Sequence, residues 1–217
     1  MTARPSAAPA KPLRRRPRQS RARLTAEALQ QAFVQLLVER GYERITIREI
    51  TGLAGTSLGS FYEYFASKED LARVCLHLRS KALLSALQQV AQAHAGQPLE
   101  ALLQAVLSAQ LGAHRGAAAE WAAHYLLERH LSGVPAYRKM YQRFIEAWVQ
   151  VLEAAADVPQ PPATPLPEVA RGCQTVLYGL VAHAHLGSDR APDLTALQRQ
   201  ASQALRGYLG QALMRPD

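Results

Sequence analysis

Apolar side chains recur at three- and four-residue intervals along most of the chain, which is the pattern of amphipathic helices. The first such run predicts a helix from Thr25, its N-cap, to Arg40, with one apolar face made of Ala28, Leu29, Ala32, Phe33, Leu36 and Leu37. Gly41 follows, where a left-handed residue commonly ends a helix. No stretch alternates apolar and polar residues for long enough to predict a strand, so we expect an all-α fold.

Two short helices and a long one are predicted next. Thr46, with Glu49 three residues on, forms the signature of a capping box at the start of the second helix. Gly55 ends that helix, and a third runs from about Ser57 to residues 65–66. Ser67 opens a fourth helix, which continues to about residue 94, where glycine and proline stop it.

Five further helices are predicted beyond this point, which gives about nine in total. A proline-rich loop separates two of them at residues 158–167. Their expected ranges are 98–113, 117–131, 135–157, 165–186 and 192–213.

Positive charge is concentrated at the N-terminus. Of the 25 basic residues, eight lie within residues 1–23, which hold no acid, so the other 17 balance the 17 acidic residues. Prolines predict that residues 1–20 form a disordered arm, and a basic arm indicates a polyanionic partner. Two interpretations stay open: the arm arginines reach the DNA minor groove, or they add only non-specific attraction. These arginines are Arg14, Arg15, Arg16 and Arg18.

Cysteine usage and hydropathy suggest a cytoplasmic protein. Cys75 and Cys173 have no CxxC spacing, so neither a disulfide framework nor a zinc site is expected. The N-terminal arm lacks the apolar core of a secretory signal, and no apolar run is long enough to predict a membrane span.

The second and third helices, joined by a tight glycine turn after a longer amphipathic helix, describe a helix-turn-helix. The third helix mixes small residues with aromatic ones, so it can approach a DNA groove closely while hydroxyls reach phosphates and base edges. The alternative is a three-helix core in which the aromatic side chains only pack.

Residues 41–50 (GYERITIREI) and 54–71 (AGTSLGSFYEYFASKEDL) resemble the TetR family of transcriptional regulators. The resemblance implies an N-terminal three-helix helix-turn-helix domain followed by a helical ligand-binding and dimerisation bundle. We therefore expect a basic arm at 1–20, a DNA-binding domain at 21–83 with its helix-turn-helix at 46–65, and an effector-binding and dimerisation domain at 84–217.

The resemblance also implies individual DNA contacts. Thr46 and Lys68 match positions that touch phosphate, Tyr62 and Tyr64 match a pair of tyrosines near the backbone, and residues 56–62 match the recognition helix. The full predicted DNA-contacting set is Thr46, Thr56, Ser57, Leu58, Gly59, Ser60, Phe61, Tyr62, Tyr64 and Lys68. Leu58 departs from the family's usual Lys or Arg and suggests contact with a thymine methyl group. Glu63 either points away or accepts from cytosine.

A ligand cavity and a subunit interface are expected in the second half. The cavity should hold a mostly apolar effector among Trp121, His124, Tyr125, Phe144, Trp148 and Tyr178, with Leu102, Val106 and Leu177 as apolar walls. The last two helices carry apolar stripes that either form a homodimer interface or complete the monomer core. We expect the homodimer, because a helix-turn-helix protein reads two half-sites through a two-fold axis.

These features predict a cytoplasmic, nucleoid-associated bacterial regulator. It would bind double-stranded operator DNA, with a palindromic site, and most relatives of this kind repress until a small effector releases them. The alternatives are a regulator without an effector and a helical enzyme. We expect no enzyme, metal or cofactor, because the sequence has no HExxH, GxSxG, P-loop or dinucleotide fingerprint. His124 and Glu128, four residues apart, are a weak candidate metal pair.

Overall fold

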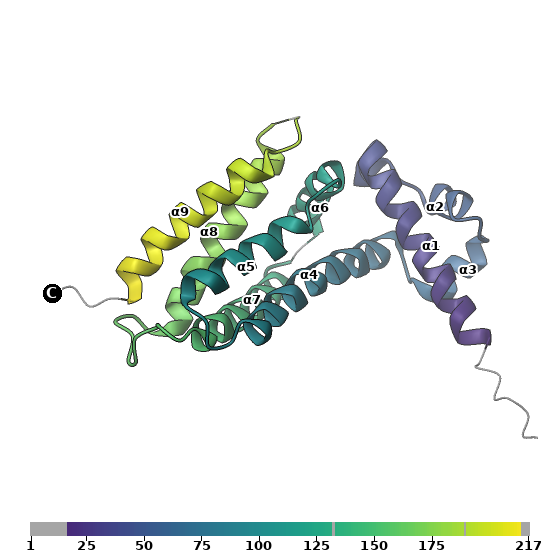
Figure 1. Ribbon diagram of the computed structural model, residues 1–217. Coiled ribbons are helices and arrows are strands. Elements are labelled where there is room, and N and C mark those ends of the chain that lie inside the picture. Colours follow the sequence, from purple (N-terminus) through teal and green to yellow (C-terminus); the bar gives the residue numbers. More distant parts are fainter. Residues whose placement is uncertain (1–16, 132, 189, 214–217) are drawn as a thin grey trace, which may run out of the picture.

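The computed structural model describes residues 17–131, 133–188 and 190–213, and within these it contains nine α-helices, one short 3₁₀ helix and no strand. The all-α prediction is confirmed. The N-terminal part, which we call the head (residues 17–75), holds three helices, a 3₁₀ turn and the start of a fourth helix (Figure 1). These elements are α1 Pro17–Arg40, η1 Tyr42–Arg44, α2 Ile47–Leu53, α3 Leu58–Tyr64 and α4 Lys68–Ala93.

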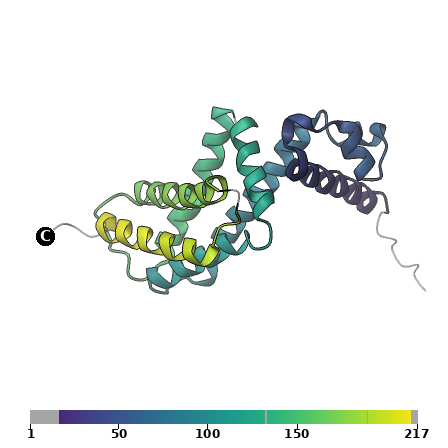
Figure 2. The same ribbon diagram turned by 90° about the horizontal axis from the view of Figure 1, so that it is seen from above.

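The rest of α4 joins five more helices in a bundle (residues 76–213). Figures 1 and 2 show the head at one end of the molecule and the bundle at the other, with α4 running between them. The bundle helices lie within a few residues of their predicted ranges. They are α5 Leu99–Gly112, α6 Ala118–Leu131, α7 Val134–Ala154, α8 Leu166–Leu186 and α9 Leu194–Leu213.

The first helix begins earlier than the sequence predicted. It starts at Pro17, so Thr25 lies inside the helix and its hydroxyl donates to the carbonyl of Arg21 at 3.0 Å. The prediction of disorder is therefore wrong for residues 17–20, where proline at a first helical position is well tolerated. The rest of the predicted arm, including Arg14, Arg15 and Arg16, lies outside the described residues. Gly41, with φ of 75°, ends α1 as predicted.

The head has its own hydrophobic core. Phe33, Ile50, Phe61 and Leu71, from four different helices, are each 0% exposed. Because α2 and α3 have only seven residues each, they depend on this core and on their caps for stability. One residue of the core comes from outside the head: Leu127 of α6 is 1% exposed and packs in the same cluster.

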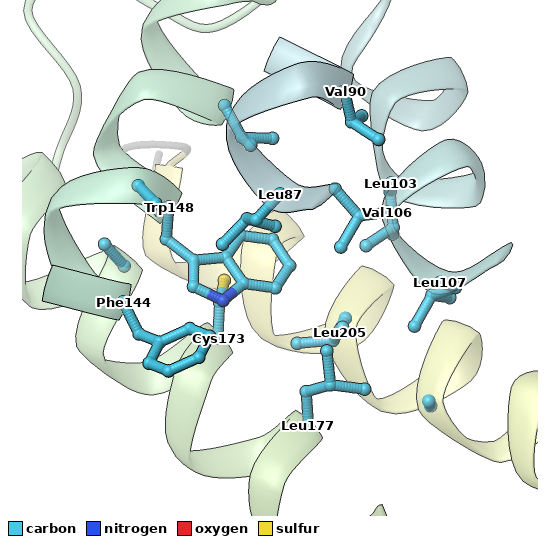
Figure 3. Close-up of a cluster of buried hydrophobic side chains, with 14 of the residues drawn as sticks. Leu87, Val90, Leu103, Val106, Leu107, Phe144, Trp148, Cys173, Leu177 and Leu205 are labelled. Carbon is cyan, nitrogen blue, oxygen red and sulfur yellow. The ribbon is translucent and has the colours of Figure 1, made fainter. Parts of the chain in front are cut away.

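A larger core fills the bundle. Figure 3 shows Trp148 at its centre, with Leu87 and Phe144 close to the indole and Leu205 and Leu177 below it in this view. The indole N–H of Trp148 donates to Oε1 of Gln174 at 3.1 Å, which satisfies its one polar group. Burial of the apolar faces of these long helices is the main term that holds the bundle together. None of the described helices combines the length and apolar character that a membrane span needs.

Helices α8 and α9 pack very closely. A Cβ added at Gly172 would come within 2.2 Å of the Tyr208 ring, so any larger residue at this position of α8 needs the Tyr208 side chain to shift. Much of the apolar stripe expected at a subunit interface is buried inside the monomer, including Cys173, Ala201 and Leu205, each 0% exposed. What remains on the outer face is partly exposed and rich in small residues: Val176, Gly179, Leu180, Ala204 and Gly207.

Candidate nucleic-acid interface and ligand cavity

The start of α2 is fixed by the predicted capping box. The backbone N–H and the hydroxyl of Thr46 donate to Oε2 of Glu49 at 2.9 and 2.8 Å, and the N–H of Glu49 donates back to the Thr46 hydroxyl at 3.3 Å. The hydrogen bond from the Thr46 hydroxyl is the main cause that lowers the pKa of Glu49. Arg40 pairs with the same carboxylate and so ties the end of α1 to α2.

A glycine turn and a serine cap set the direction of α3. Gly55 has φ of 64°, which favours glycine, and the N–H of Thr56 donates to the carbonyl of Thr51 at 2.9 Å across the turn. Ser57 then caps α3, since its Oγ accepts from the N–H of Ser60 at 3.0 Å. The hydroxyls of Ser57 and Ser60 also lie 3.0 Å apart.

One face of α3 is buried and the other is exposed. Leu58 and Tyr62 are 41% and 55% exposed, and Ser57, Gly59 and Glu63 are exposed beside them. Thr56, Ser60 and Tyr64 are half-buried, and Tyr64 packs against the head core. Phe61 is 0% exposed, so its inclusion among the DNA-contacting residues is corrected: its position in α3 turns it toward the core, where it supports the helix from inside.

Lys68 ties the head together. Its Nζ donates to the carbonyls of Tyr42 and Ile45 at 2.9 and 3.0 Å and lies 4.3 Å from the centroid of the Tyr42 ring. The ammonium thus holds the segment before α2 against the start of α4. The phosphate contact expected for Lys68 stays a prediction, and so do the contacts expected for the exposed residues of α3.

A cavity of about 90 Å³ lies among the helices α4 to α8, and we call it the bundle cavity. Its lining includes most of the predicted residues: Trp121, His124, Tyr125, Phe144, Leu177 and Tyr178. Trp148, by contrast, is 1% exposed and belongs to the bundle core, as do Leu102 and Val106. These three are corrected from cavity to core, because their side chains point into the packed centre of the bundle.

The lining is more polar than the sequence predicted. Glu128 accepts from the hydroxyl of Tyr178 at 2.8 Å, and Gln110 donates to the carbonyl of Leu83 at the same distance. Arg79 of α4 also lines the cavity, with its Cζ 4.1 Å from the centroid of the Trp121 ring. Gln110 and Arg79 were not predicted from the sequence, and Glu128 was predicted only as one half of a weak candidate metal pair. Nothing in the sequence around Arg79 indicates that this arginine of a long helix is buried. Its burial results from contacts with residues of α6, which are distant in sequence.

Burial keeps the histidines of this region neutral. It lowers the pKa of His114 to about 3 and that of His124 to about 4, since a charged ring would lose its hydration there. Nδ1 of His114 lies 2.8 Å from Nε2 of His185, and the His114 ring stacks on Trp121 with centroids 3.8 Å apart. Across the part of the chain that the structure describes, no three His, Cys, Asp or Glu side chains come together as a metal site.

Comparison with known proteins finds sequence similarity in the head and similarity of fold over most of the chain. Residues 31–75 match the family model described as bacterial regulatory proteins of the tetR family. Over 69 residues the chain is 33% identical to the uncharacterized HTH-type transcriptional regulator YwcC of Bacillus subtilis, a match that covers 30% of this chain and 31% of that protein. Over 71 residues it is 39% identical to the transcriptional regulator AcuR of Cereibacter sphaeroides, with 32% of each covered. The matched part thus spans about a third of the length of these relatives.

The similarity of fold extends much further. The structure of SmeT, the repressor of the multidrug efflux pump SmeDEF of Stenotrophomonas maltophilia, superposes with a TM-score of 0.69 over 87% of this chain and 90% of SmeT. The two sequences are only 15% identical, so this match shows a shared fold. The predicted architecture of a helix-turn-helix head on a helical bundle is confirmed.

Proposed function

We propose that this chain, whose residues 31–75 match the model of the tetR family of bacterial regulatory proteins, is a transcriptional repressor that binds operator DNA through α3. The observation that carries the proposal is the two-sided character of α3. Phe61 anchors the helix in the core, while Leu58 and Tyr62 are exposed at the surface of α3 with small residues around them. The Tyr62 ring packs edge-on against Phe61 with centroids 5.4 Å apart, so the core also fixes the exposed ring. A rigid helix with such a surface fits the major groove.

A palindromic operator is bound by two heads, one from each protomer of a dimer. The outer face of α8 and α9 is suited to form the interface between the two protomers. Its small residues, Gly179, Ala204 and Gly207, permit close approach of a second copy, and Val176 and Leu180 supply apolar area. A charge at the exposed Ala204 tests this: Ala204→Arg should turn a dimer into a folded monomer in sedimentation velocity. A wild-type protein that sediments as a monomer at micromolar concentration would contradict the dimer.

Two helices, α4 and α6, contribute residues both to the head core and to the bundle cavity, which supports release of DNA by an effector. Helix α4 contributes Leu71 and Ala72 to the head core and Arg79 to the bundle cavity. Helix α6 contributes Leu127 to the head core and Trp121 to the cavity. A ligand that shifts either helix changes the position of the head, so the spacing of two heads in a dimer would respond to the cavity.

The test begins with selection of duplexes from a random pool by the purified protein, followed by binding measurements on the selected sequence. Leu58→Glu should lower the affinity by at least tenfold, because it places a carboxylate beside phosphates. Leu126→Glu is the matched control, since Leu126 is an exposed leucine of α6, 58% exposed, and should bind DNA as the wild type does. Absence of any selected sequence at low salt, or equal affinities for the two variants, would refute the proposal.

A further inference from the structure

Arg79 has an unmet hydrogen-bond donor beside the bundle cavity. Its side chain is 20% exposed, and Nη2 donates to Oε2 of Glu120 at 3.0 Å. The other terminal nitrogen, Nη1, is buried and has no partner among the described residues. An unsatisfied buried donor destabilises the folded chain, and more so when it belongs to a charged group, so an acceptor that reached Nη1 would be bound favourably.

The surroundings leave the positive charge of Arg79 only partly balanced. Glu120 is its one nearby carboxylate in the described structure, and its side chain is 46% exposed, so water weakens its attraction. His114 and His124 line the same region, and their lowered pKa values keep both rings neutral at pH 7. This end of the cavity therefore favours an anion.

The carboxylate of Glu128, which also lines the cavity, gives it only a weak preference for a cationic ligand. Glu128 is seven positions beyond Trp121 on α6, a rise of about 10 Å along the helix axis, whereas Arg79 stacks on Trp121 itself. Its carboxylate already accepts from the Tyr178 hydroxyl, and burial is the main cause that raises its pKa. Both features reduce its demand for a positive partner. Between the two ends lie Tyr125, Phe144 and Leu177, which offer aromatic and apolar contact.

Volume limits the ligand. The cavity of about 90 Å³ is smaller than the engineered cavity of roughly 150 Å³ that admits benzene, so a single ring is the upper limit and enters only when the lining side chains move apart. We therefore propose that the bundle cavity binds a small organic carboxylate, whose acid group accepts from Nη1 of Arg79 and whose body, no larger than one ring, packs against Tyr125 and Leu177. This inference rests on the proposed function for its regulatory meaning, because it names the chemical class of the effector.

Entry of the acid requires movement. Nη1 is covered in this structure, so the guanidinium or the Trp121 ring above it must rotate before an acid can reach it. Arg79 belongs to α4 and Trp121 to α6, the two helices that also build the head core. Binding at this point would thus act directly on the helices that position α3.

Three ligands of one shape provide the test: benzoate, benzamide and benzylamine, which carry a negative, a neutral and a positive substituent on the same ring. Calorimetric titration of the full-length protein without DNA should show benzoate binding at least tenfold more tightly than the other two, as one hydrogen bond to a charged group implies. Hexanoate serves as a second acid of different shape. Tighter binding of benzylamine than of benzoate, or no binding of either acid at millimolar concentration, would overturn the proposal.

Variants connect the binding to Arg79. Arg79→Met should lower the affinity for benzoate about ten- to hundredfold and leave benzamide unaffected. Arg73→Met, at an exposed arginine of the same helix, is the control and should bind as the wild type does. If Arg79→Met does not fold, Arg79→Lys keeps the charge but lacks the planar fork and should still lose affinity. Unchanged benzoate affinity in the folded variant would refute the role of Arg79. Glu128→Gln, at the other carboxylate of the cavity, should not lower the affinity for benzoate.

The two proposals can fail separately. Ligand binding is measured without DNA, and DNA binding is measured without ligand. A protein that binds benzoate through Arg79 but selects no duplex supports the cavity chemistry and refutes the regulator. A protein that selects a duplex but binds neither acid supports the regulator and refutes the carboxylate.

Discussion

Helices α2 and α3 of the head have seven residues each, whereas α5 to α9 of the bundle have 14 to 21. A seven-residue helix is unstable alone, so the head depends on specific devices: a capping box at Thr46, a serine cap at Ser57 and the left-handed glycine Gly55. The long helices of the bundle need only a continuous apolar face. The head is therefore constrained at individual positions, and the bundle by its overall packing.

The head should depend heavily on a few buried side chains. Phe61→Ala removes a ring that is 0% exposed and should lower the free energy of unfolding by about 3–5 kcal/mol, because the cavity cannot close around α3. Chemical denaturation followed by circular dichroism measures this loss. Tyr62→Ala, one position on and 55% exposed, loses only an edge-on contact with the Phe61 ring and should cost at most about 1 kcal/mol. Equal losses in the two variants would contradict the two-sided description of α3.

The bundle should be the acid-sensitive part. His114 and His124 have pKa values of about 3 and about 4 in the folded chain against 6.5 in the unfolded one, so below pH 6.5 only the unfolded chain takes up these protons. The free energy of unfolding should therefore decrease as the pH is lowered, by about 2 kcal/mol for each histidine between pH 7 and pH 5. His185, whose pKa is also lowered by burial, acts in the same direction, and Glu128, whose pKa is raised, opposes it.

Urea denaturation at pH 7 and pH 5, followed by tryptophan fluorescence, measures this effect in the bundle because Trp121 and Trp148 both lie there. His124→Gln should remove part of the pH dependence. His183→Gln, at an exposed position of α8, should leave it unchanged. A stability that is equal at the two pH values would refute the assignment of neutral buried histidines.

Close packing in the bundle should be sensitive at one glycine and tolerant at another. Gly172→Ala places a methyl group within 2.2 Å of the Tyr208 ring and should cost about 1–3 kcal/mol through overpacking. Gly210→Ala, in α9 and with no atom within 4 Å of the added methyl group, should raise stability by about 0.5–1 kcal/mol through helix propensity. Thermal unfolding of both variants checks the pair, and a neutral Gly172→Ala would show that α9 can shift away.

The smallest expected effect concerns the start of α2. Thr46→Ala removes the hydroxyl that accepts from the N–H of Glu49 and should cost about 1 kcal/mol. Thr46→Ser keeps the hydroxyl and should restore most of that stability. Denaturant titration separates the two variants, and identical midpoints would mean that the capping box adds nothing measurable to the head.

Local signals explain why so much of the helical structure was predictable. Caps, glycines and prolines mark helix ends within a few residues of each position, so the bounds of α2, α3, α4 and α8 follow from sequence. The start of α1 was missed because Thr25 has the chemistry of a cap but lies in mid-helix, where its hydroxyl bonds back to Arg21.

Residues whose role depends on packing were harder to predict. Phe61 and Trp148 are aromatic residues on amphipathic helices, and sequence periodicity does not tell a core ring from one that faces a groove or a cavity. Arg79 illustrates the opposite error. Its burial depends on Trp121 and Glu120, 41 or more residues away in sequence, and no local pattern announces such a contact.

Leu127 has a consequence for how such proteins are divided and recombined. This leucine of α6 completes the head core, although more than 50 residues separate it from Cys75, the last residue of the head. A head cut free after Cys75 would lose one wall of its interior and should be less stable than in the full chain. Exchange of the C-terminal half between proteins of this fold, in the laboratory or in evolution, would therefore be favoured where the incoming α6 presents a side chain that fits the resident head.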